Sequence, residues 1–218
     1  RQRLLPRNYD GAAKRVLLGL GATNPKGVLD KVLDAIEQAS LRLAPDLVLA
    51  WNTPDGERLA ARAERAGGRV HVDVDNMAEL MADADIAVGA GGMSSWERCT
   101  LGLPTLLLVI ADNQRANAEA LATAGAARIV KPETNALVEA INALAGDSAA
   151  LERMSRAASR LADGIGAIRV SQAVGELPCA RDGQAVRLRP VTAEDSDLLL
   201  ELQRKPETRR FARNRNIP

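Results

Sequence analysis

The sequence is poor in aromatic residues, cysteine and histidine, and it has little excess charge of either sign. Its 218 residues include two tryptophans, one tyrosine, one phenylalanine, two cysteines and one histidine. Two cysteines are too few for a disulfide framework, and no CxxC pair or cysteine–histidine cluster predicts a metal site. A formal net charge of +1 argues against binding nucleic acid through bulk electrostatics, so we expect no nucleic-acid partner.

Long hydrophobic runs are also missing. The longest span about six residues, whereas a membrane-spanning helix needs roughly 20, so we expect no membrane span. No signal peptide is evident, which makes the cytoplasm the default location. The chain begins at Arg1 instead of methionine and stops at Pro218 without an obvious end to a fold, so we expect further segments at both ends.

The hydrophobic residues, 46% of the chain, form short buried runs that alternate with stretches of helical periodicity between residue 14 and about residue 163. Six candidate strands span residues 15–20, 46–51, 69–73, 85–88, 105–110 and 127–130. Repeated strand–helix alternation of this kind predicts an α/β fold, a Rossmann-like, doubly wound parallel six-stranded sheet.

We expect residues 14–178 to form this domain, with one or two closing helices after residue 146, and residues 1–13 to be a linker remnant. Residues 179–218 are more basic and differ in pattern: residues 186–189 alternate like a strand, and Thr192 is a candidate helix cap. A strand and a helix cannot bury a core alone. The tail is therefore either a fragment of a second domain or an extension packed on the first.

Two glycine-rich loops follow predicted strands. Residues 19–25 resemble a G-x-G-x-x-G fingerprint, but the second strand ends in Trp51 instead of the acidic residue that holds a nicotinamide ribose, so we predict no cofactor. Residues 89–97 follow a buried strand and open a helix, which suits a diphosphate. Glu97 is placed to bind ribose hydroxyls. The alternative is that Ser94 only caps the helix and Glu97 completes a capping box.

A third polar cluster, residues 111–117, ends the fifth predicted strand and suits sugar hydroxyls or an acetamido group. The alternative is that Asp112 or Asn113 caps the next helix. His71 lies inside a predicted strand and Cys99 lies on a helix, so we expect both to be structural. No catalytic residue is predicted, and the chain is better equipped to hold a nucleotide than to react with it.

The run Gly89-Ala-Gly-Gly-Met-Ser-Ser-Trp-Glu and its continuation to Gln114 resemble the C-terminal domain of the pseudaminic-acid-pathway UDP-sugar hydrolases. These enzymes release UDP from UDP-2,4-diacetamido-2,4,6-trideoxy-altropyranose and are also described as spore coat polysaccharide biosynthesis proteins. They are similar to the lipid II-forming N-acetylglucosaminyltransferase, which implies the C-terminal half of a B-type glycosyltransferase fold. Residues 18–26 and 75–85 extend the resemblance, with Ala22 and Asn24 departing from the usual first loop.

The resemblance implies a UDP-sugar as the small-molecule partner and assigns each part of it to particular residues. Gly21 and Thr23 would face the phosphates, and Val74, through its backbone, and Met77 would flank the uracil. The remaining implied contacts are diphosphate at Gly91, Gly92, Met93 and Ser94, ribose at Glu97, and sugar at Asn113 and Gln114.

The hydrolases take their catalytic histidine from an N-terminal domain that does not precede Arg1, and His71 does not fit that motif. This missing domain would be a partner of the same parent chain, and the chain alone would hydrolyse negligible substrate. Residues 186–195 resemble the start of a GNAT acetyltransferase, a fusion known in this family. A glycosyltransferase of the same fold and a non-catalytic nucleotide-binding module remain the alternatives.

Overall fold

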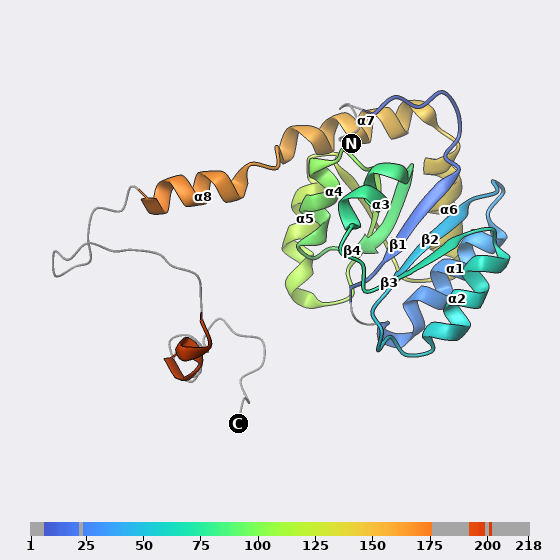
Figure 1. Ribbon diagram of the computed structural model, residues 1–218. Helices are drawn as coiled ribbons and strands as arrows, with labels where there is room; N and C mark the ends of the chain where they lie inside the picture. The colour runs from blue at the N-terminus through green and yellow to red at the C-terminus, as the bar shows by residue number, and fades with distance from the viewer. Residues whose placement is uncertain (1–6, 22–23, 176–191, 199–200, 202–218) are drawn as a thin grey trace. The chain divides into compact units, whose positions relative to one another are not determined.

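Six strands form one parallel sheet, which confirms the predicted Rossmann-like fold (Figure 1). The computed structural model describes residues 7–21, 24–175, 192–198 and 201. The strand order is β3-β2-β1-β4-β5-β6, and every neighbouring pair is parallel. The strands are β1 (Arg15–Gly19), β2 (Ala44–Leu49), β3 (Arg69–Val72), β4 (Ile86–Ala90), β5 (Thr105–Leu108) and β6 (Ala127–Val130).

The central strands β4 and β5 are buried along their whole length, as expected for a parallel sheet that is covered on both faces. The predicted bounds were wrong by one or two residues in most strands. In particular, β4 continues through Gly89 and Ala90, which the sequence pattern placed in a loop. The reason is register: Gly89 pairs with Gly19 of β1 and with Leu107 of β5, so its backbone belongs to the ladder.

Helices cover the two faces of the sheet in separate sets (Figure 1). One set packs on the large core cluster, which draws residues from β1, β2, β4, β5 and β6, and the other packs on two smaller clusters. The first set is α1 (Val28–Gln38), α2 (Gly56–Arg65) and α6 (Thr134–Ala145). The second is α3 (Met77–Asp83), α4 (Ser94–Thr100), α5 (Arg115–Thr123) and α7 (Ser148–Leu161).

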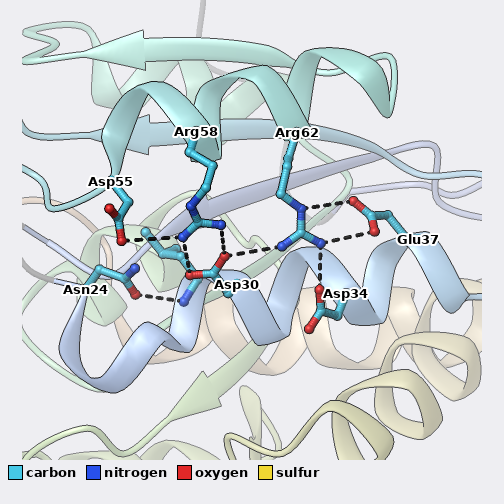
Figure 2. Close-up of polar contacts among 8 residues, drawn as sticks. Asn24, Asp30, Asp34, Glu37, Asp55, Arg58 and Arg62 are labelled. Atoms are coloured by element: carbon cyan, nitrogen blue, oxygen red, sulfur yellow. Dashed lines mark hydrogen bonds and ion pairs between the residues drawn. The ribbon is translucent and has the colours of Figure 1, made fainter.

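An ion-pair network joins α1 to α2 (Figure 2). The Arg62 guanidinium lies 2.6 Å from Asp34, 3.0 Å from Glu37 and 3.2 Å from Asp30. Arg58 donates to Asp30 at 2.5 Å, and this hydrogen bond, opposed by partial burial, lowers the pKa of the Asp30 carboxyl. The network fixes α1, whose first turn follows the loop after β1.

The chain divides after Gly166 into two compact units, and the sheet belongs to the first. The described part of the second contains most of α8 (Gly166–Gly175) and a 3₁₀ helix, Ala193–Asp195. At its start, the backbone N–H of Thr192 donates to the Asp195 carboxylate at 2.8 Å. The predicted strand at 186–189 lies outside the described residues, so the acetyltransferase resemblance stays a prediction. Among the described helices, none is long and apolar enough to cross a membrane.

Candidate functional site

The strand order reverses between β1 and β4, and ligands of open α/β sheets bind beyond the carboxyl ends of the strands at such a point. A cavity of about 210 Å³ lies there. It is lined by Leu17, Gly19, Gly21, Val48, Leu49, Ala50, Asp73, Val74, Met77, Met81, Ala87, Val88, Ser94 and Arg98. Four of the residues predicted from the sequence are in this lining: Gly21, Val74, Met77 and Ser94.

The first glycine loop contributes Gly21 to the cavity wall. Gly21 has φ of 81°, a left-handed conformation that glycine adopts without strain, and apart from its chain neighbours no described residue has a heavy atom within 4 Å of the place a Cβ would occupy. Thr23, the other residue predicted here, lies outside the described residues. The Asn24 side chain accepts a hydrogen bond from the backbone N–H of Leu29 at 2.9 Å, so it stabilises the start of α1 (Figure 2).

Val74 and Met77 form an apolar wall on the side of α3. Both are partly buried and pack against the core cluster that contains Leu17 and Met81. Asp73, directly before this wall, has φ of 47° and accepts a hydrogen bond from the backbone N–H of Trp51 at 3.1 Å. This contact joins the ends of β2 and β3 beside the cavity. Its signal in the sequence, an aspartate at the end of a predicted strand, is too common to identify it.

Hydrogen bonds from α5 stabilise the second glycine loop, residues 91–93. The Asn117 amide donates to the Gly91 carbonyl at 2.7 Å and to Ser95 Oγ at 2.9 Å. Ser95 is buried, and its hydroxyl donates to the Gly92 carbonyl. The Ser95 hydroxyl is therefore committed to the loop, which leaves Ser94 as the serine that faces the cavity.

The capping alternative for this loop is wrong. The residue that precedes α4 is Met93, and no side chain forms a cap hydrogen bond there. Ser94 is the first residue of the helix, and Glu97 is exposed and does not complete a capping box. Met93 is 80% exposed. Glu97 and Met93 thus lie outside the cavity lining, on the loop and helix at its edge.

The third polar cluster forms a 3₁₀ helix, Asp112–Gln114, that leads into α5. The Gln114 side-chain oxygen accepts a hydrogen bond from the backbone N–H of Ile110 at 3.2 Å, and its Nε2 lies 3.9 Å from the Cβ position of Gly92. Asn113 is exposed on the same turn. Neither Asp112 nor Asn113 caps α5, so that alternative is also wrong.

Arg98 lines the cavity and was not predicted. Its side chain is 4% exposed, and its guanidinium lies against Gly89, where an added Cβ would meet Nη1 at 2.7 Å. It donates to the Ala90 carbonyl at 2.7 Å and to Ser94 Oγ at 3.3 Å. Burial lowers the pKa of Arg98 to about 10, so the group is still a cation at neutral pH. The only sequence signal was its position one helical turn after Ser94.

His71 and Cys99 both lie outside the cavity lining, and their structural role stays a prediction. His71 Nε2 lies 3.6 Å from the buried Asp46 carboxylate, which also pairs with the partly exposed Arg15 and Arg69. Burial alone would raise the pKa of Asp46, but hydrogen bonds from the two arginines outweigh it and hold the pKa at about 2. Burial raises the pKa of the Cys99 thiol to about 11. Within the described part of the chain, no cluster of His, Cys, Asp and Glu could hold a metal ion.

This geometry agrees with the comparisons to known proteins. Residues 69–168 match the glycosyltransferase family 28 C-terminal domain. The crystal structure of Acinetobacter baumannii MurG shares the fold, with a TM-score of 0.62 and 21% sequence identity over 78% of this chain and 51% of that one. The first unit therefore has the fold of one half of a B-type glycosyltransferase, and residues 69–168 within it resemble the family 28 C-terminal domain.

Two curated proteins show which relatives share this domain. The chain is 30% identical over 178 residues to the spore coat polysaccharide biosynthesis protein SpsG of Bacillus subtilis (strain 168), covering 75% of this chain and 50% of SpsG. It is 36% identical over 128 residues to the UDP-N-acetylglucosamine–N-acetylmuramyl-(pentapeptide) pyrophosphoryl-undecaprenol N-acetylglucosamine transferase of Chlorobaculum parvum (strain DSM 263 / NCIMB 8327), covering 53% of this chain and 35% of the transferase. The chain spans at most half the length of these two relatives.

Proposed function

We propose that the first unit binds a UDP-sugar and is the donor-binding half of an enzyme of the glycosyltransferase type. The observation that carries this proposal is the cavity at the β1–β4 switch point, where Gly21, Val74, Met77 and Ser94 come together. An apolar wall suits a uracil ring, and exposed backbone next to a hydroxyl suits a diphosphate. The similarity to a transferase that uses UDP-N-acetylglucosamine supports the choice of nucleotide.

The other predicted contacts lie outside the cavity lining, and in this proposal they complete the site. Gly92 presents its backbone to the diphosphate, Glu97 accepts hydrogen bonds from the ribose hydroxyls, and Asn113 and Gln114 contact the sugar. Gly91 shapes the loop instead, because its N–H donates to the Leu108 carbonyl at 3.2 Å. The cavity volume of about 210 Å³ is below the roughly 300–1,000 Å³ of typical small-molecule sites. This supports a site that a second domain completes, and we propose that such a domain supplies the catalytic base.

Isothermal titration calorimetry of the chain with UDP tests the proposal. UDP binding is expected, and Glu97→Ala should weaken it about tenfold because the ribose loses charge-assisted hydrogen bonds. Glu64→Ala is the matched control, since Glu64 is an exposed carboxylate on α2, on the opposite face of the sheet. An absence of binding at millimolar UDP, or equal affinity in Glu97→Ala, would favour a module that does not bind nucleotides at this site.

The acceptor distinguishes two forms of the activity. The resemblance of residues 89–114 to UDP-sugar hydrolases supports transfer to water. The match to glycosyltransferase family 28 and the similarity to an N-acetylglucosamine transferase support transfer to another sugar. UDP release by the complete enzyme in the absence of an acceptor supports the hydrolase, whereas release that requires an acceptor supports the transferase. The isolated chain should release negligible UDP in either case.

A further inference from the structure

Arg98 is a buried cation. It is 4% exposed, and none of the ion pairs among the described residues includes it. Its Nε is buried and has no hydrogen-bond partner in the same part of the chain. Buried charges in proteins are nearly always paired, because leaving one unpaired costs several kcal/mol in the folded state.

The position of this cation is as unusual as its burial. The guanidinium lies against Gly89 of β4, and the place of the absent Gly89 Cβ is also 3.1 Å from the Gly19 carbonyl of β1. Arg98 is therefore at the junction of β1 and β4, where the strand order reverses, and it forms part of the cavity lining. A larger residue at position 89 would displace the guanidinium.

Ser94 connects the cation to the open part of the cavity. Arg98 Nη1 donates to Ser94 Oγ at 3.3 Å, and the Ser94 hydroxyl proton goes to no described residue. Ser95 differs, because its own hydroxyl donates to the Gly92 carbonyl. Since Ser94 Oγ accepts from a cation, its O–H is directed away from Arg98 and available to an acceptor in the cavity.

We propose that Arg98 is the counter-charge for the diphosphate of the bound nucleotide and the positioning residue that aims the Ser94 hydroxyl at it. The identity of the nucleotide in this proposal rests on the proposed function. The preference for an anion is inferred separately, from the geometry of Arg98. The α4 helix has only seven residues, so its dipole is a weak source of positive potential. Arg98 supplies a full positive charge beside Ser94, the first residue of this helix.

A merely structural role is the competing explanation, since Arg98 also joins α4 to the Ala90 carbonyl of β4. The two roles differ in ligand dependence. Loss of a structural contact weakens binding of every part of the nucleotide, whereas loss of a counter-charge weakens only binding of its phosphates. Uridine and inorganic pyrophosphate separate these parts of the ligand.

The test is calorimetric titration of UDP, uridine and inorganic pyrophosphate into wild type, Arg98→Met, Arg98→Lys and Ser94→Ala. Arg65→Met is the control, since Arg65 is an exposed arginine on α2. Arg98→Met should lose about 10- to 100-fold in UDP affinity and stay within about twofold for uridine. Arg98→Lys should keep more UDP affinity than Arg98→Met, and Ser94→Ala should show a smaller loss confined to UDP and pyrophosphate.

Equal losses for UDP and uridine in a folded Arg98→Met variant would overturn the proposal, as would equal UDP affinity in Arg98→Met and wild type. If Arg98→Met does not fold, Ser94→Ala and Arg98→Lys are compared with wild type instead. Pyrophosphate affinity that is unchanged in both variants overturns the proposal. If wild type binds pyrophosphate through Arg98 but not UDP, the proposed function fails and the anion site stands. If wild type binds neither, both fail.

Discussion

Replacing Asn117 with alanine tests whether the second glycine loop depends on α5 for its shape. The variant removes the amide that donates to the Gly91 carbonyl at 2.7 Å and to Ser95 Oγ at 2.9 Å. Two neutral hydrogen bonds contribute about 2 kcal/mol, and alanine regains roughly 0.5 kcal/mol through its higher helix propensity. The expected loss of unfolding free energy is therefore about 1.5 kcal/mol.

The same change should reduce UDP affinity by about tenfold, because the backbone that faces the phosphates loses its support. Urea unfolding measures the stability, and calorimetric titration with UDP measures the affinity. Asn135→Ala is the matched control: Asn135 is exposed and lies in the first turn of α6, whereas the partly buried Asn117 lies in the first turn of α5. If Asn117→Ala unfolds like Asn135→Ala and binds UDP like wild type, the loop does not need this support and the reasoning is refuted.

Three further predictions concern packing and charge. Keeping the pKa of Asp46 at about 2 instead of 3.8 stabilises the fold by about 2 kcal/mol at pH 7. This contribution is present above pH 3.8 and is lost as the pH falls toward 2, so acid unfolding of wild type and Asp46→Asn should converge there. Gly91→Ala places a Cβ 3.3 Å from Ala118 Cβ and should cost about 1 kcal/mol in urea unfolding and also weaken UDP binding. Arg62→Met should lose about 1 kcal/mol at low salt and less at 1 M salt, because the partly exposed Asp34 and Glu37 lose their partner and Asp30 keeps only Arg58.

Each of these has a control or an opposing outcome. Asp10→Asn removes an exposed carboxylate and should leave acid unfolding unchanged. A pH-independent difference between wild type and Asp46→Asn down to pH 2 would contradict the role of the Asp46 charge. Gly11→Ala has open space around the added Cβ and should not affect UDP binding. A salt-independent loss in Arg62→Met would assign the effect to packing of the side chain instead of its charge.

The sequence alone determined the six strands, their parallel arrangement and the position of the glycine loops. These features follow from local pattern: apolar runs four to six residues long, bounded by polar residues or glycine, leave few alternatives to buried parallel strands. The strand ends were less accurate, because whether Gly89 belongs to a strand or a loop depends on its pairing with Gly19 and Leu107.

The tertiary structure decided which of the candidate residues meet. The adjacency of β1 and β4 brings Gly21, Val74, Met77 and Ser94 to one cavity, and no local pattern encodes strand order. Asn117 donates to the Gly91 carbonyl although the two residues are 26 positions apart in the sequence. Their spacing in the sequence does not predict this hydrogen bond. The sequence analysis did not single out Arg98, and only its packing against Gly89 makes it a buried cation. The burial of Arg98 and its lack of an ion pair depend on residues that are distant in the sequence. The local sequence motif therefore could not predict the positive charge at this site, which follows from the tertiary structure.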